Sequence, residues 1–225
     1  MGMNRARVKD EVAARDHFLA ALAGRRESDR PFRHVVLTDP LPGPMAEALA
    51  ALPIPPASID DTQGKRDSHN STRVFFNPDF GARHAVAASL AALFQDPAVP
   101  GALIRYCGAA LGGTSLRVEY CQDTDGFWLE PHTDIGAKKL TLQIYLNNGP
   151  DAESLGTDLY DAHGAWLGRA PSKFVNGFLF VPGNVTFHGF VRRPFAGVRR
   201  SVIVNYVGPE WRARHELAFP SQPVL

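Results

Sequence analysis

The chain has 225 residues, enough for one domain that buries a sizeable core. Its 24 lysines and arginines almost balance its 23 aspartates and glutamates, so no overall field recruits nucleic acid or an acidic membrane surface. The sequence has no apolar run long enough to span a membrane, and residues 1–10 lack the apolar core of a secretory signal, which predicts a soluble cytoplasmic protein. The only two cysteines, Cys107 and Cys121, are too few for a disulfide scaffold and are expected as reduced thiols.

Helical patterns dominate residues 1–113. Apolar residues recur at helical spacing over four segments: 5–24, 44–52, 79–94 and 96–111. Short strands are expected at 32–37 and in the apolar run 74–76. The segment 53–70 is rich in Pro, Ser, Asp and Gly and has no apolar period, which is typical of a surface loop. His69 in this loop and Arg73 just after it are candidates for substrate contact, and an ordinary solvated loop is the alternative.

From Thr114 onward the period of the pattern changes from helix to strand. Six strands are expected, separated by clusters of Gly, Pro, Asn and Asp: 116–120, 140–146, 157–161, 178–181, 187–191 and 198–207. Many short strands at this spacing predict a double-stranded β-helix of the jelly-roll or cupin-like kind. We therefore expect an α+β fold with a mainly β core, in one domain of 225 residues. It would comprise a helix-rich part (1–113) packed on the core (114–208), and a tail (209–225).

A metal site is suggested by His132, Asp134 and His188. Residues two apart on a strand share a face, so His132 and Asp134 can point into a barrel together while Thr133 points away. Two imidazoles and one carboxylate suit a non-haem Fe(II) centre. The same ligands also occur in zinc hydrolases, and H-x-D alone arises often by chance.

An anion site is suggested by Arg199 and Ser201, which share one face of the last predicted strand. A guanidinium binds both oxygens of a carboxylate and stays charged even when buried. The pair therefore suits a ligand that carries a carboxylate.

Together these residues resemble the Fe(II)- and 2-oxoglutarate-dependent oxygenases, and more closely their prolyl-hydroxylase-like branch. The similarity covers roughly residues 114–208 and rests on H-x-D, a distant His, and R-x-S, here His132, Asp134, His188, Arg199 and Ser201. The segment Ile144-Tyr145-Leu146-Asn147 is similar to the Y-Y-L-N strand of that branch. The resemblance implies that Tyr145 and Arg199 hold the distal carboxylate of 2-oxoglutarate, that Tyr120 lines the same pocket, and that Gln143, on the strand face of Tyr145, lines it too.

The resemblance also implies an activity. Fe(II), 2-oxoglutarate and O2, with ascorbate assisting, would hydroxylate a C–H bond of an amino acid, a protein residue or a small metabolite, releasing succinate and CO2. Nucleic-acid dealkylation is disfavoured, because the DNA- and RNA-demethylating branch of the family has a second arginine at the position that is Asn205 here. Asp134 favours hydroxylation over halogenation, since halogenating relatives replace this aspartate by a small residue.

Two other functions remain open from the sequence. A cupin-like metal enzyme that does not use 2-oxoglutarate would explain the ligands but not Arg199, Ser201 and Tyr145. A barrel that binds a ligand or partner without catalysis would have ligands that fail to converge, or a filled pocket. Trp128 and Trp211 either border the substrate mouth or pack as ordinary aromatic residues. The sequence does not identify the substrate or the oligomeric state.

Overall fold

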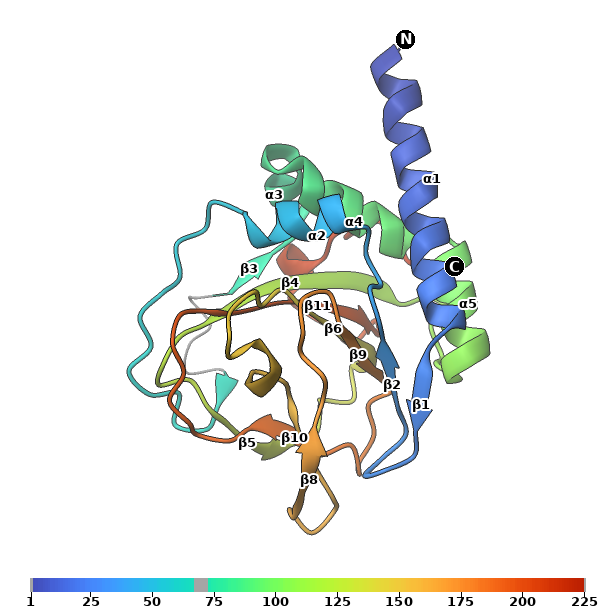
Figure 1. The fold of residues 1–225 in the computed structure, drawn as a ribbon. Coiled ribbons are helices and arrows are strands. Elements are labelled where there is room, and N and C mark those ends of the chain that lie inside the picture. The colour runs from blue at the N-terminus through green and yellow to red at the C-terminus, as the bar shows by residue number, and fades with distance from the viewer. Residues whose placement is uncertain (1, 67–72, 225) are drawn as a thin grey trace.

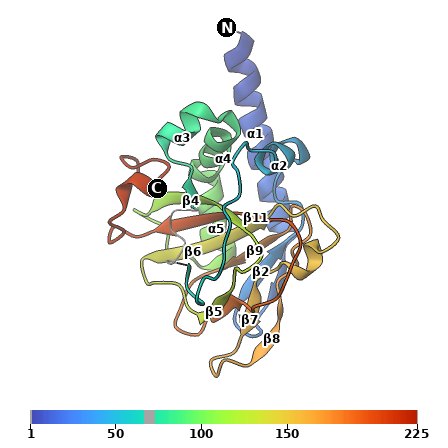
Figure 2. The same cartoon turned by 90° about the vertical axis from the view of Figure 1, so that its left-hand side faces the viewer.

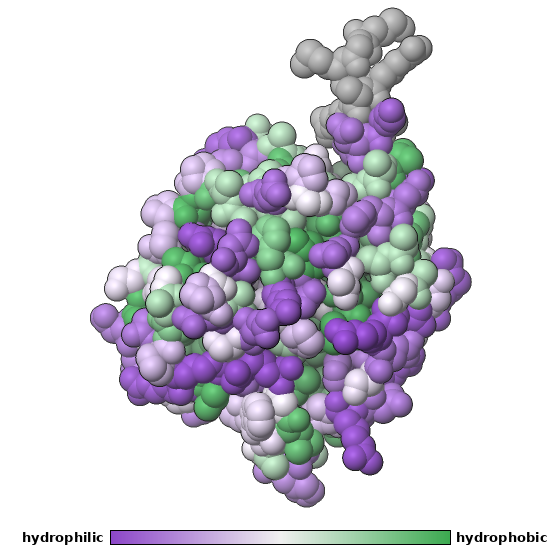
Figure 3. All heavy atoms as spheres, viewed as in Figure 1, coloured by the Kyte–Doolittle hydropathy of each residue, from purple (hydrophilic) through white to green (hydrophobic). Residues whose placement is uncertain are grey.

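The computed structural model describes residues 2–66 and 73–224 (Figure 1). Two antiparallel β-sheets form the centre of the molecule, and five helices lie on the outer side of the larger sheet (Figures 1 and 2). This arrangement confirms the expected order of an α-helical N-terminal part followed by a mainly β core. On the face seen in Figure 3, hydrophobic residues lie in small groups between hydrophilic ones.

The helices are α1 (Gly2–Ala23), α2 (Gly43–Ala50), α3 (Pro78–Arg83), α4 (Ala85–Gln95) and α5 (Ala98–Cys107). The most apolar of them, α4, packs centrally: α1 meets it through an edge-on contact of Phe18 and Phe94, whose ring centroids are 5.0 Å apart. The single helix expected over 79–94 is wrong, because His84 adopts an extended backbone and separates α3 from α4. In the described residues no single helix is long and apolar enough to cross a membrane; the bent pair α4 and α5 meets that test by length and composition only.

The larger sheet has seven strands, and every neighbouring pair in it is antiparallel. Its order is β1 (Arg26–Ser28), β2 (His34–Leu37), β9 (Gly177–Phe180), β6 (Lys138–Tyr145), β11 (Arg199–Val207), β4 (Ser115–Asp123) and β3 (Val74–Phe75). Alternation along the strands gives this sheet two different faces. Leu116, Val118 and Val204 belong to the apolar core, whereas Arg117 and Glu119 line a cavity on the other side.

The smaller sheet has the order β5 (Leu129–His132), β10 (His188–Phe190), β7 (Asp158–Tyr160) and β8 (Trp166–Arg169). It lies on the side of the larger sheet away from the helices (Figure 2). Strands β1 and β8 were not expected, because both are short and largely exposed and lack apolar alternation. The pairing of β10 with β5 sets His188 directly opposite His132.

One irregular segment, residues 54–66, lies alongside the segment that connects β4 to β5, and we call it the strap. Thr124 donates to the carbonyl of Ala57 (3.0 Å), and the indole of Trp128 donates to Asp61 (2.6 Å). Further along, the amide of Glu130 donates to the carbonyl of Gly64 (3.0 Å). These bonds hold the strap against the smaller sheet, so it forms part of a wall of the cavity between the sheets.

Candidate active site

A cavity of about 450 Å³ lies between the two sheets. His132, Asp134, His188, Gln143 and Arg199 all line it. The three expected metal ligands and the expected anion anchor are therefore brought to one hollow from β5, the turn after it, β10 and β11. The cavity is open space, which argues against a barrel whose interior is filled by side chains.

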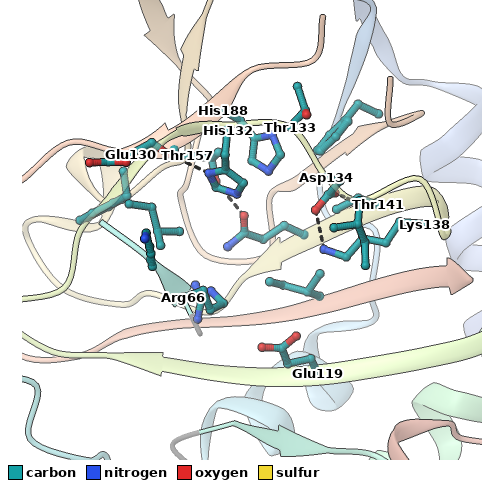
Figure 4. A pocket seen from close by; sticks show the side chains of 18 of the residues that line it. Arg66, Glu119, Glu130, His132, Thr133, Asp134, Lys138, Thr141, Thr157 and His188 are labelled. Atoms are coloured by element: carbon teal, nitrogen blue, oxygen red, sulfur yellow. Dashed lines mark hydrogen bonds and ion pairs between the residues drawn. The ribbon is translucent and has the colours of Figure 1, made fainter. Parts of the chain in front are cut away.

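The two histidines are held in the same way. The Nδ1 atom of His132 lies 2.8 Å from the carbonyl oxygen of Glu130, and that of His188 lies 3.0 Å from the carbonyl oxygen of Thr186. A carbonyl can only accept, so each Nδ1 carries a proton, and in the neutral imidazole the lone pair then lies on Nε2. The ring centroids are 4.6 Å apart (Figure 4). This is the orientation that metal-binding histidines usually have.

The protonation state of His188 also suits a ligand. Burial lowers its pKa from 6.5 to about 4, and the Asp134 carboxylate opposes that change only in part. His188 is therefore neutral at pH 7, which metal binding requires.

Asp134 is engaged by protein groups. Its Oδ1 lies 2.5 Å from Nζ of Lys138, and its Oδ2 accepts from Oγ1 of Thr141 at 2.7 Å (Figure 4). Burial opposes a charge on Asp134, but Lys138, His188 and the hydrogen bonds from Lys138 and Thr141 together outweigh it and hold the pKa of this carboxyl below its usual range. The carboxylate is thus charged, as a metal ligand must be, and it is turned toward β6.

Two imidazoles and one carboxylate are suitable ligand types for a divalent metal, but the three side chains do not converge on one point. In the two described stretches, no three side chains of His, Cys, Asp or Glu are grouped closely enough to hold a metal ion. Both oxygens of Asp134 are bonded to protein groups instead, Oδ1 to Lys138 and Oδ2 to Thr141. The two imidazoles, each bonded through Nδ1 to a backbone carbonyl, are the part of the site that is already in place.

A hydrogen-bonded row of polar side chains forms the floor of the cavity. Ser201 accepts from the amide of Gln143 (3.0 Å), and Gln143 accepts from the hydroxyl of Thr157 (2.7 Å). Tyr145 in turn donates to Thr157 (2.9 Å). Gln143 and Thr157 line the cavity, whereas Ser201 and Tyr145 are fully buried behind them. Ser201 and Tyr145 were expected to contact the cosubstrate, but neither lines the cavity, and both position Gln143 and Thr157 instead.

Arg199 is buried at the cavity wall, with 2% of its surface exposed. Its Nε donates to the carbonyl of Leu155 (2.7 Å), and its Nη1 lies 2.5 Å from Oδ2 of Asp123. The pairing with Asp123 follows from register, because Arg199 is directly opposite Asp123 across β11 and β4. Arg199 thus lies at the cavity wall, with a carboxylate partner that the sequence did not reveal.

Tyr120 corrects one expectation. It shares the face of Leu116 and Val118, belongs to the core beneath the helices and stacks on Phe76 with ring centroids 6.2 Å apart. It is not among the residues that line the cavity. Strand alternation excludes it, since the cavity receives Arg117 and Glu119 from the opposite face of β4.

Of the remaining candidates for substrate contact, some line the cavity and others do not. Arg73 and Trp211 line the cavity, whereas the indole of Trp128 is held by Asp61 of the strap. His69 lies outside the described residues. Both cysteines are free and buried, as expected.

The sequence reasoning missed several charged residues of the cavity wall. Arg66 of the strap, Arg117, Glu119 and Lys138 all line it. Thr141 shares a strand face with Gln143 on β6, so alternation could have predicted that it lines the cavity. Arg117 and Glu119 share one face of β4 and could have been predicted together in the same way. No local signal marks Arg66, because the strap has no period.

Comparisons with known proteins identify the fold. No family model and no curated protein sequence matches the chain. A prolyl hydroxylase from Trichoplax adhaerens, solved with a peptide fragment of the hypoxia inducible factor oxygen degradation domain, matches over 91% of this chain and 93% of its own, with a TM-score of 0.60 and 13% identity. A prolyl 4-hydroxylase from Phytophthora capsici matches over 88% and 66%, with a TM-score of 0.58 and 16% identity.

A prolyl-4-hydroxylase from Pseudomonas putida matches over 85% of this chain and 92% of its own, with a TM-score of 0.52 and 16% identity. Three such enzymes agree with the resemblance expected from His132, Asp134, His188 and Arg199. At these identities the likeness concerns the backbone. The chain has the fold of the prolyl hydroxylases.

Proposed function

We propose that this protein is an Fe(II)- and 2-oxoglutarate-dependent oxygenase of the prolyl-hydroxylase-like branch, built on a double-stranded β-helix. The observation that carries the proposal is the paired orientation of His132 and His188. Both imidazoles present a free Nε2 in one cavity, beside a charged Asp134 and a buried Arg199. The fold shared with prolyl hydroxylases supports it.

Each group has a role that its surroundings allow. His132, His188 and Asp134 would hold Fe(II), and the backbone carbonyls of Glu130 and Thr186 would keep both imidazoles in the binding tautomer. Bound iron and 2-oxoglutarate would together supply the activation of dioxygen for C–H hydroxylation. Arg199 would bind the distal carboxylate of 2-oxoglutarate, and Gln143 and Thr157 offer polar atoms along the cavity floor.

The substrate belongs to the class of amino acids, protein residues or small metabolites. A peptide lies on the prolyl hydroxylase from Trichoplax adhaerens, which supports a peptide among the candidates. A cupin-like enzyme that uses no 2-oxoglutarate is the alternative, and it gives the Arg199 guanidinium only the structural partners Asp123 and Leu155, with no ligand to bind in the cavity.

Turnover tests the proposal. Protein supplied with Fe(II), ascorbate, O2 and 2-oxoglutarate should release succinate slowly by itself, and faster with a suitable amino acid, peptide or metabolite from a screen. The variant H188A should release none, while H163A, at an exposed histidine that does not line the cavity, should match the wild type. Equal succinate release by wild type and H188A would contradict the assignment.

A further inference from the structure

Two arginines share one carboxylate at the cavity wall. Asp123 receives Arg199 on Oδ2 at 2.5 Å and Arg66 on Oδ1 at 3.3 Å. Asp123 and Arg199 side chains are each 3% exposed, and that of Arg66 is 19% exposed. Both arginines line the cavity. The two guanidinium groups therefore come together, one from β11 and one from the strap.

The same aromatic ring supports both cations. The guanidinium carbon of Arg66 lies 4.7 Å from the ring centre of Phe127, and that of Arg199 lies 5.8 Å from it. A second ring, Phe190, lies 4.7 Å from the guanidinium of Arg199. Packing against rings limits the side-chain freedom of both arginines, so they are held in place before any ligand arrives.

The charges of this cluster do not cancel. Arg66 and Arg199 carry two positive charges, and Asp123 carries one negative charge. The neighbouring acid Glu119 has its own partners, Arg73 at 3.0 Å and Arg117 at 2.8 Å, and Arg117 is paired with Glu216 as well. That second group contains two cations and two anions. Among residues 2–66 and 73–224, one positive charge of the first cluster is therefore left without an anion in contact with it.

A buried, uncompensated charge is costly, and a bound anion removes the cost. We propose that Arg66 is a second anchor for the distal carboxylate of 2-oxoglutarate, acting beside Arg199. This inference rests on the proposed function and adds a binding residue to it. A monoanionic carboxylate at this point would bring the cluster of Arg66, Arg199 and Asp123 to neutrality.

The position of Arg66 links cosubstrate binding to the strap. Arg199 lies on a central strand of the larger sheet, but Arg66 depends on the bonds that hold the strap to the smaller sheet. Figure 4 shows Arg66 across the cavity from the two histidines. A ligand that bridges the histidines and Arg66 would therefore join the two sheets and the strap.

Binding of two related 2-oxo acids tests this role. Protein loaded with Ni(II) is titrated without oxygen with 2-oxoglutarate and with 2-oxopentanoate, which has the same chain length and no distal carboxylate. Wild type, R66M, R66K and R192M are compared by calorimetry, after circular dichroism has confirmed that each is folded. R192M is the matched control, because Arg192 also reaches the strap, 3.5 Å from Asp61, from an exposed position.

R66M should bind 2-oxoglutarate about 10- to 100-fold more weakly, as expected for losing one charge-assisted bond, and should bind 2-oxopentanoate as the wild type does. R66K should fall between the two, and R192M should match the wild type. If R66M lost affinity equally for both acids, or for neither, the anchor role of Arg66 would be wrong. If the wild type bound no 2-oxoglutarate, the proposed function itself would fail.

Discussion

Replacing Lys138 by Met should strengthen metal binding. The Lys138 ammonium lies 2.5 Å from Asp134, so it competes with a metal for the same carboxylate and adds a positive charge beside the ion. A hydrogen bond to a charged group contributes about 1.5–3 kcal/mol net. Releasing Asp134 from this bond should therefore tighten the binding of a divalent metal by about 10- to 100-fold.

The assay is calorimetric titration of metal-free protein with Ni(II) at pH 7.5, compared with T141V. Thr141 donates the other bond to Asp134, at 2.7 Å, but carries no charge. T141V should bind Ni(II) more weakly, because a second partner that orients the carboxylate is lost. Tighter Ni(II) binding by K138M and weaker binding by T141V would show that Lys138 competes with the metal for Asp134, whereas Thr141 orients the carboxylate. An affinity of K138M that is equal to or below that of the wild type would refute the reasoning.

Two further predictions concern the cavity wall. Burial opposes a charge on Glu119, but Arg117, Arg73 and Arg66 outweigh it and lower its pKa from 4.5 to about 2. The folded state then releases this proton more readily than the unfolded state, so the stabilisation is complete above pH 4.5 and is lost as the pH falls toward 2. In urea unfolding, the wild type should exceed E119Q by roughly 3 kcal/mol at pH 7, with the difference shrinking below pH 4.5; a difference independent of pH would contradict this. Gly126, at φ +96°, has room for no side chain, since a Cβ there would clash with the carbonyl oxygen of Ile59 in the strap. G126A should therefore displace the strap and weaken 2-oxoglutarate binding. The control G164A, at φ +81° with open space around it, should not change the affinity. Equal affinities of G126A and the wild type would show that the strap does not contribute to cosubstrate binding.

Much of the β core was readable from local patterns. Alternation paired Arg199 with Ser201 and Gln143 with Tyr145 on shared strand faces, and H-x-D with a distant His marked three residues that the structure brings into one cavity. Tyr120 was placed in the pocket by the resemblance, although it has the strand parity of Leu116 and Val118, which belong to the core. The resemblance to the oxygenases led away from that signal.

Other features depend on contacts between distant segments. Asp123 meets Arg199 only through the register of β4 with β11, which no local pattern fixes. Arg66 reaches the cavity because the strap is bonded to Trp128 and Glu130, more than sixty residues along the chain. The break at His84 lies in an alanine-rich run that favours helix throughout, so propensity gave no warning of it.

The claim that Fe(II) and 2-oxoglutarate occupy one site can be measured directly. Metal-free protein, titrated with Fe(II) under anaerobic conditions and then with 2-oxoglutarate, should develop the weak visible charge-transfer band of their complex. The band should be missing in H132A and in H188A, and it should need more 2-oxoglutarate in R66M. A wild-type protein that binds Fe(II) yet shows no band with 2-oxoglutarate would contradict the account.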